Sequence, residues 1–176
     1  QFPLWNRLHA MGARTFVAAW QNGVWYLFGE RYTEEIAPAS VHAADIASMA
    51  QGIPQGYIYD PARAQDAAEL EACGLGPMVA AANPVLAGIA TLTGAINAGR
   101  FKVMRGRCPN FMDQMERYSF PTDANTGTVN RENPIKKDDH LPDCARYLVQ
   151  TLEGAREEPD VEMTCFYEDD TVISRY

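Results

Sequence analysis

The spacing of hydrophobic and polar residues changes from one segment of the chain to the next, and each spacing predicts a helix, a strand or a loop. Two runs rich in β-branched and aromatic residues, 15–20 and 24–28, flank Gln21-Asn22-Gly23. Asn-Gly favours the positive φ angles of a tight turn, so we predict an antiparallel hairpin here. Its aromatic residues are expected to pack in the core rather than to stack on nucleic-acid bases. They are Trp20, Trp25, Tyr26 and Phe28.

After the hairpin, helical and extended patterns take turns. Apolar spacing predicts helices over residues 38–50, 62–73, 84–98 and 109–118, and from Asp138 or Asp139 to about residue 152. Short apolar runs predict strands over residues 57–59, 78–82 and 101–104, and residues 122–134 have the composition of a loop. A hairpin followed by such alternation indicates an α/β fold, a mixed sheet flanked by helices on both faces. We expect one domain over residues 1–154 and an acidic tail over residues 155–176.

Composition narrows the functional classes. The 176 residues carry a formal net charge of −8, which is unlike the basic face of a protein that coats DNA. A nuclease that holds metal ions with carboxylates can nevertheless be acidic. No apolar run reaches the roughly 18 residues of a membrane span, and no GxxxxGK[ST] sequence indicates a P-loop ATPase. Four scattered cysteines without a CxxC pair favour reduced thiols, so we expect a soluble, intracellular protein.

The densest cluster of reactive side chains is the sequence KKDDHLPD of residues 136–143, at the expected start of the last helix. Asp139 and Asp143 are four residues apart and would share one helix face, with His140 beside Asp143. One interpretation is a catalytic or metal-binding site. The other is helix capping by Asp138 and Asp139, because the helix dipole favours carboxylates at this end.

Asp60 is a second candidate, because it follows the expected strand over residues 57–59. The carboxyl ends of strands in α/β sheets commonly carry groups that contact ligands. A plain Asp-Pro turn explains the same residue and is the simpler interpretation when Asp60 is taken alone.

Together these segments resemble the C-terminal nuclease domain of the large terminase subunit of tailed bacteriophages. The sequence KKDDHLPDCARY of residues 136–147 is similar to a signature near the end of that domain. The sequence YIYDPA of residues 57–62 is similar to its strand that ends in a metal-binding Asp. Residues 74–75, 82–85, 88–89 and 115–118 fit the family's layout, so the resemblance covers most of residues 15–152.

The resemblance implies an RNase H-like fold and a metal-dependent endonuclease that uses Mg²⁺ or Mn²⁺, with two ions. It implies that Asp60, His140 and Asp143 are catalytic. The implied metal ligands or their close neighbours are Asp60, Asp139, His140 and Asp143, and the implied contacts to DNA phosphates are Lys136 and Lys137.

The family's role would be to cut concatemeric DNA during genome packaging in the host cytoplasm. Its implied partners are double-stranded DNA, a portal protein and the small terminase subunit. The isolated domain is expected to be monomeric. A resolvase-type or transposase-type nuclease is a further alternative within the same fold.

One carboxylate of the family pattern is missing. The family's first acidic ligand lies on the strand before the hairpin, but residues 1–15 contain no Asp or Glu. Asn6, Arg7 and His9 in this region do not replace a bridging carboxylate. Three explanations are open. The chain begins after the ligand or with foreign residues, or the ligand has been lost, or Glu30 substitutes for it. For Glu30, a role as a surface residue at the end of a strand is the simpler interpretation.

If the ligand is lost, the nuclease would be weak or inactive. The domain would then serve as a module that docks on the portal or on another packaging subunit. The acidic tail after Gly154 would be the candidate docking segment.

Overall fold

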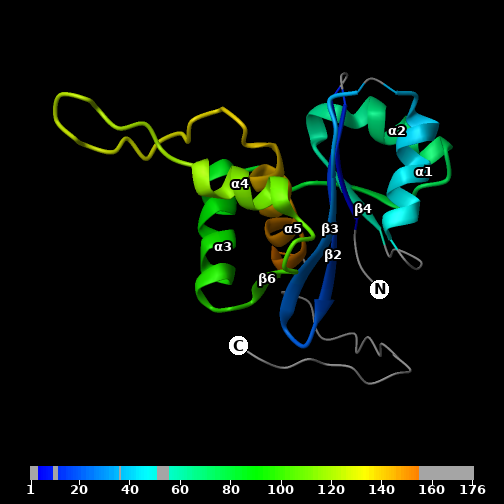
Figure 1. Ribbon diagram of the computed structural model, residues 1–176, viewed down its shortest axis with the longest axis horizontal. Coiled ribbons are helices and arrows are strands. Elements are labelled where there is room, and N and C mark those ends of the chain that lie inside the picture. Colours follow the sequence, from blue (N-terminus) through cyan, green and yellow to red (C-terminus); the bar gives the residue numbers. More distant parts are fainter. Residues whose placement is uncertain (1–3, 10–11, 36, 51–55, 155–176) are drawn as a thin grey trace.

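A single mixed sheet of six strands forms the centre of the described structure (Figure 1). The computed structural model describes residues 4–9, 12–35, 37–50 and 56–154, with side chains from Arg14 onwards. The strand order is β5-β4-β1-β2-β3-β6. The strands are β1 (Leu4–His9), β2 (Gly12–Gln21), β3 (Val24–Tyr32), β4 (Tyr57–Tyr59), β5 (Met78–Ala80) and β6 (Phe101–Val103).

The first three strands run antiparallel to their neighbours along the chain, and the others join the sheet in parallel. β1 pairs with β2, and β2 with β3, in antiparallel register. β4 lies parallel to β1, β5 parallel to β4, and β6 parallel to β3. Asn22 and Gly23 turn the hairpin with φ angles of 50° and 81°, which confirms the predicted hairpin.

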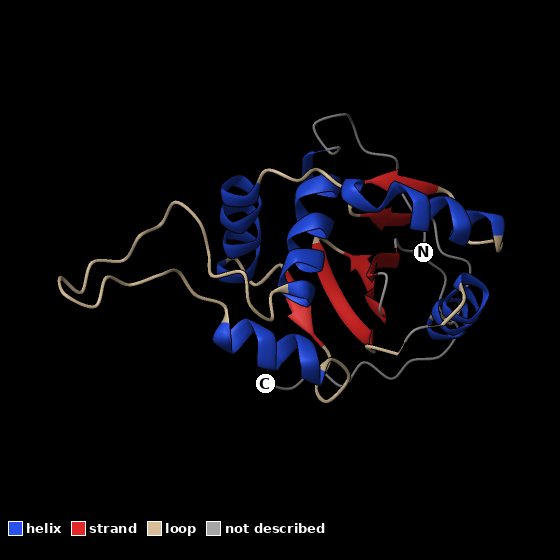
Figure 2. Ribbon diagram, turned by 90° about the horizontal axis from the view of Figure 1, so that it is seen from above, coloured by secondary structure: helices blue, strands red, loops and turns tan. Residues whose placement is uncertain are grey.

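Helices cover both faces of the sheet, as predicted. α1 and α2 lie on one face, and α3, α4 and α5 lie on the other (Figures 1 and 2). The helices are α1 (Ala39–Met49), the 3-10 turn η1 (Pro61–Arg63), α2 (Ala64–Ala72), α3 (Val85–Asn97), α4 (Pro109–Arg117) and α5 (His140–Gly154). No helix among the described residues is long and apolar enough to cross a membrane.

Alternation along the strands divides the core between the two faces. Phe16 and Ala18 on β2 belong to the cluster beneath α3, α4 and α5, whereas Val17 belongs to the cluster beneath α1 and α2. On β4, Ile58 and Tyr57 divide between the clusters in the same way. Trp25 is buried in the first cluster, as expected for a core aromatic residue.

The pattern of apolar and polar residues missed β1, which precedes the hairpin and lies at the centre of the sheet. Asn6 pairs with Thr15 of β2 and with Tyr59 of β4. The six residues of β1, LWNRLH, mix apolar and polar types without regular alternation, so the residue pattern predicted no strand, although the resemblance implied one before the hairpin. The strands of the hairpin are also longer than predicted, since β2 begins at Gly12 and β3 continues to Tyr32.

The helix predicted over residues 62–73 is divided in two. Pro61 begins the turn η1, the Asp60 side chain caps that turn, and α2 starts only at Ala64. The loop predicted over residues 122–134 is confirmed as part of a long connection between α4 and α5, and it projects from the body (Figure 1). The predicted tail over residues 155–176 lies outside the described residues.

Candidate active site at the start of helix α5

Two carboxylates meet at the first turn of α5, as the spacing predicted. Asp139 immediately precedes the helix, and its carbonyl oxygen accepts a hydrogen bond of 2.9 Å from the backbone N–H of Asp143. Both side chains are buried, with 6% of Asp139 and 2% of Asp143 exposed. Because buried carboxylates require charged or hydrogen-bonding partners, the neighbours of this pair define the site.

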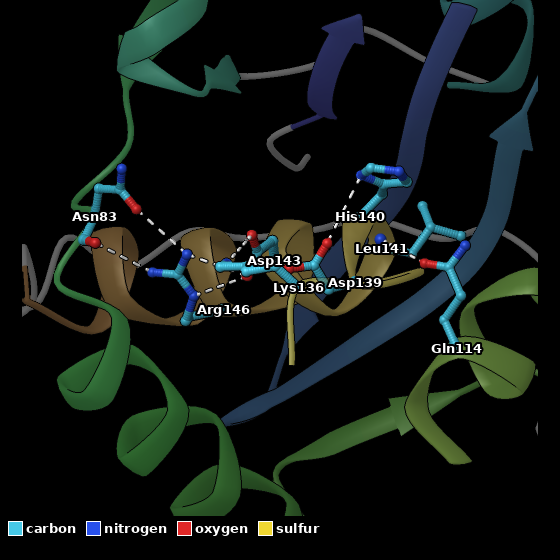
Figure 3. Close-up of polar contacts among 8 residues, drawn as sticks. All are labelled: Asn83, Gln114, Lys136, Asp139, His140, Leu141, Asp143 and Arg146. Atoms are coloured by element: carbon cyan, nitrogen blue, oxygen red, sulfur yellow. Dashed lines mark hydrogen bonds and ion pairs between the residues drawn. The ribbon is translucent and has the colours of Figure 1, made fainter. Parts of the chain in front are cut away.

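Lys136 lies between the two carboxylates (Figure 3). Its Nζ is 3.0 Å from Oδ2 of Asp139 and 3.3 Å from Oδ2 of Asp143. The Lys136 side chain is 56% exposed, so its ammonium group reaches the buried carboxylates from the surface. One positive charge thus offsets the repulsion between two negative ones.

Arg146 contacts the other oxygen of Asp143 (Figure 3). Its Nε and Nη2 donate to Oδ1 of Asp143 at 3.3 and 3.2 Å. Its Nη1 and Nη2 donate to the backbone oxygen and to Oδ1 of Asn83, both at 3.3 Å. Sequence reasoning gave Arg146 no role; the available signal was an arginine three residues after Asp143, on the same face of the helix.

Gln114 was also missed, and it fixes the start of α5 from outside the helix. Its Oε1 accepts a hydrogen bond of 2.9 Å from the backbone N–H of Leu141, which is one of the N–H groups without a partner inside the helix. His140 lies on the same turn, with Nδ1 3.9 Å from Oδ1 of Asp139, beyond hydrogen-bond distance. Figure 3 shows the two contacts on either side of the helix start.

Asp60 lies buried at the end of β4, where the sequence placed it. Its Oδ1 accepts a hydrogen bond of 3.0 Å from the backbone N–H of Ala62, so the Asp-Pro turn is part of the structure. Lys137 is exposed on the segment that leads into α5. Catalytic and phosphate-binding roles for these two residues stay predictions.

Glu30 is a helix cap rather than a plain surface residue. Its Oε1 accepts hydrogen bonds from the backbone N–H and the Nδ2 of Asn110, at 2.7 and 2.8 Å. Its Oε2 accepts from the backbone N–H of Phe111 at 2.9 Å. Both oxygens are therefore engaged at the start of α4, which removes the reason to regard Glu30 as a replacement ligand.

Tyr118 follows α4, and the charged side chains of the site affect its pKa. Burial, the main cause, and the negative charges of Asp143 and Asp139 raise the pKa of Tyr118 to about 12, against the opposing effect of Arg146. The phenol therefore keeps its proton and can act as a hydrogen-bond donor near these carboxylates.

The pair Asp139 and Asp143 has the chemistry of a site for a hard divalent cation. Mg²⁺ and Mn²⁺ prefer carboxylate oxygens, and two such oxygens already share one ammonium group. Over the described ranges, no group of three or more His, Cys, Asp or Glu side chains is arranged to hold a metal ion. The strand β1, next to β4 in the sheet, contributes no Asp or Glu. Metal binding by the four expected ligands therefore stays a prediction.

Solved structures with this fold include viral large terminases. The chain aligns with the large terminase of a thermophilic bacteriophage at a TM-score of 0.75 and 22% identity, over 87% of this chain and 40% of that one. It aligns with the nuclease domain of the bacteriophage SPP1 large terminase, solved with bound Mn, at a TM-score of 0.60 and 16% identity. That alignment covers 82% of this chain and 81% of the SPP1 domain.

The large terminase of bacteriophage HK97 aligns at a TM-score of 0.60 and 17% identity, over 84% of this chain and 38% of that one. The chain thus spans about two fifths of the thermophilic-phage and HK97 proteins. No protein-family model matches the sequence, and no curated protein matches it. The comparisons confirm the expected RNase H-like fold and its likeness to terminase nuclease domains.

Proposed function

We propose that the chain is the nuclease domain of a phage large terminase, a metal-dependent endodeoxyribonuclease that cuts concatemeric DNA during genome packaging. The observation that supports this most directly is the buried pair Asp139 and Asp143, which share the ammonium group of Lys136 on this fold. The SPP1 nuclease domain, which has the same fold, was solved with bound Mn. In this proposal the partners are double-stranded DNA, a portal protein and the small terminase subunit, in the host cytoplasm.

Mg²⁺ or Mn²⁺, as two ions, would be held by Asp139 and Asp143 together with Asp60. Bound there, the ions would polarise the phosphodiester and lower the pKa of water. Lys136 and Lys137 would bind DNA phosphates as flexible point charges. His140, 3.9 Å from Asp139, would orient that carboxylate or move a proton.

A second candidate function follows from β1. This strand occupies the centre of the sheet beside β4 and carries no carboxylate. A nuclease that lacks one acidic ligand should bind metal weakly and cut slowly. In that case the domain would act as a docking module on the portal or on another packaging subunit.

Nicking of supercoiled plasmid in the presence of Mn²⁺ separates the two functions. We expect nicking by the wild-type chain, its loss in EDTA, and its loss in Asp143→Asn, which keeps the shape of the side chain but removes its charge. Asp138→Asn is the matched control. Asp138 precedes Asp139 in the sequence, but its carboxylate lies 3.5 Å from Arg117 and is not part of the buried pair. The control should nick like the wild type.

The melting temperature gives an independent reading of metal binding. Mn²⁺ should raise the melting temperature of the wild-type chain and of Asp138→Asn, but not that of Asp143→Asn. A folded wild-type chain with neither nicking nor a thermal shift would overturn the nuclease proposal and leave the docking module.

A further inference from the structure

Arg146 carries a buried positive charge that the proposed chemistry does not use. Only 2% of its side chain is exposed, although burying a charged group costs free energy. Such a group is tolerated inside a protein when its donors are paired, and here the partners are Asp143 on one side and Asn83 on the other. Its contacts therefore indicate what it holds in place.

The contacts give the two oxygens of Asp143 different tasks. Arg146 donates to Oδ1 from both Nε and Nη2, and Lys136 lies at Oδ2. Because both donors belong to one planar group and meet the same oxygen, they hold Oδ1 in place more firmly than a single flexible donor would. Oδ2 is therefore the oxygen kept toward Lys136 and Asp139 (Figure 3).

The other end of the guanidinium is anchored to the segment between β5 and α3. Asn83 accepts from Arg146 with both its backbone oxygen and its side-chain Oδ1. The same segment is tied to α5 a second time, because Thr151 Oγ1 accepts a hydrogen bond of 2.9 Å from the backbone N–H of Ala82. Arg146 is thus held between two elements that are themselves fixed to each other.

Gly88 on α3 provides the space in which the stem of Arg146 lies. A Cβ atom at Gly88 would be 2.3 Å from Cγ of Arg146 and 2.7 Å from its Cδ. These atoms belong to the aliphatic part of the side chain, which cannot swing away as a flexible end could, so a side chain at Gly88 would displace Arg146. Gly94 in the same helix has nothing within 4 Å of the corresponding position.

We propose that Arg146 is the positioning residue of this site, with Asn83 as its anchor and Gly88 as the space that it requires. Arg146 holds Oδ1 of the Asp143 carboxylate, so that Asp143 presents Oδ2 as its ligand to a divalent cation. This inference rests on the proposed function, because the oriented oxygen is the one that would meet the metal.

The test is the affinity of the whole chain for Mn²⁺ alone, measured from the electron paramagnetic resonance signal of the free ion. Gly88→Ala and Gly94→Ala form a matched pair that adds the same methyl group to one helix. We expect wild-type affinity in Gly94→Ala and a loss of about 10-fold to 100-fold in Gly88→Ala, as found when groups that orient metal ligands are removed. Arg146→Lys, which keeps the charge but loses the fork, should show a similar loss.

A purely structural role for Arg146 predicts a different result. Gly88→Ala and Arg146→Lys would then melt at lower temperature, but their folded forms would bind Mn²⁺ as the wild type does, and this result would overturn the proposal. If Gly88→Ala does not fold, Arg146→Lys decides the question at a temperature where circular dichroism shows it folded.

A wild-type chain that binds no Mn²⁺ would refute the proposed function without deciding the role of Arg146. Crystal structures of Arg146→Lys and of the wild type would then decide it. A rotated Asp143 carboxylate in the variant supports positioning by Arg146, and an unchanged carboxylate overturns it.

Discussion

The two faces of the sheet are covered by helices that bury different kinds of side chain. Beneath α1 and α2 the buried cluster is small and apolar, with Ile46 and Leu70 fully buried and His42 beside them on α1. Beneath α3, α4 and α5 a larger apolar cluster surrounds the helix that carries Asp143 and Arg146. One sheet thus supports an apolar layer and a layer that contains buried charge.

The apolar cluster and the buried charges should contribute differently to the stability of the fold. Removing ions from water costs free energy that their mutual attraction often fails to recover, so a buried ion pair is weak evidence for stability. An apolar cluster, in contrast, stabilises the fold in rough proportion to the area that it removes from water. On the α5 face the buried charges should therefore contribute less to stability than an apolar core of the same size would, whereas on the α1 face the apolar cluster should contribute most of the stability.

The largest expected effect comes from breaking the charged pair on the α5 face. Arg146→Met should lower the free energy of unfolding by about 3–5 kcal/mol, because it leaves Asp143 buried with less compensation. The double variant Asp143→Leu/Arg146→Met should recover most of that loss. Urea denaturation measures both. A double variant as unstable as the single one would mean that the pair does stabilise the fold.

On the opposite face, Ile46→Ala should cost about 3 kcal/mol, because it removes a fully buried side chain and leaves a cavity. The folded variant should bind Mn²⁺ with wild-type affinity, since Ile46 lies across the sheet from α5. Urea denaturation and a Mn²⁺ titration check the two halves of this prediction. A weakened metal affinity would show that the two faces are coupled.

Glu30→Gln should cost about 1 kcal/mol, because it weakens the cap of α4 and removes a negative charge from the positive end of that helix. Mn²⁺ affinity should not change. Glu34→Gln is a suitable control, since 77% of the Glu34 side chain is exposed. A loss of metal affinity in Glu30→Gln alone would restore Glu30 as a candidate ligand.

The smallest effect concerns His42 and pH. Burial, the main cause, and the nearby Arg31 lower the pKa of His42 below 6.5, against the opposing charges of Asp45 and Glu35 and a hydrogen bond that His42 donates to the backbone of Ala37. As the pH falls below 6.5, the unfolded chain takes up a proton at this position before the folded chain does, so stability falls. The urea midpoint should drop between about pH 7.5 and pH 5.5, and less so in His42→Gln. If the urea midpoint drops equally in the wild type and in His42→Gln, titratable groups other than His42 cause the change.

The sequence predicted the helices and the short strands well, because their apolar spacing and the Gly and Pro residues at their ends are local signals. It also placed Asp139 and Asp143 on one helix face, since four residues make about one turn. Its apolar pattern missed β1, because that pattern is irregular and the place of β1 depends on pairing with β2 and β4. It gave no role to Gln114, whose partner Leu141 lies 27 residues away along the chain. It also gave none to Arg146, because the contact with Asn83, 63 residues away, is not visible in the sequence, although Asp143 is only three residues away.

The caps of α4 and α5 have a consequence for the order in which the chain folds. Cys108, at the start of α4, provides no side-chain cap, and Glu30 supplies one from 80 residues away. Gln114 on α4 then supplies an acceptor to the start of α5. Each helix start therefore depends on an earlier segment already being in place, and contacts between distant segments form slowly because they require large loops to close. We expect the turn that bears Asp139 and Asp143 to be among the last to form, after the hairpin and α4 have docked.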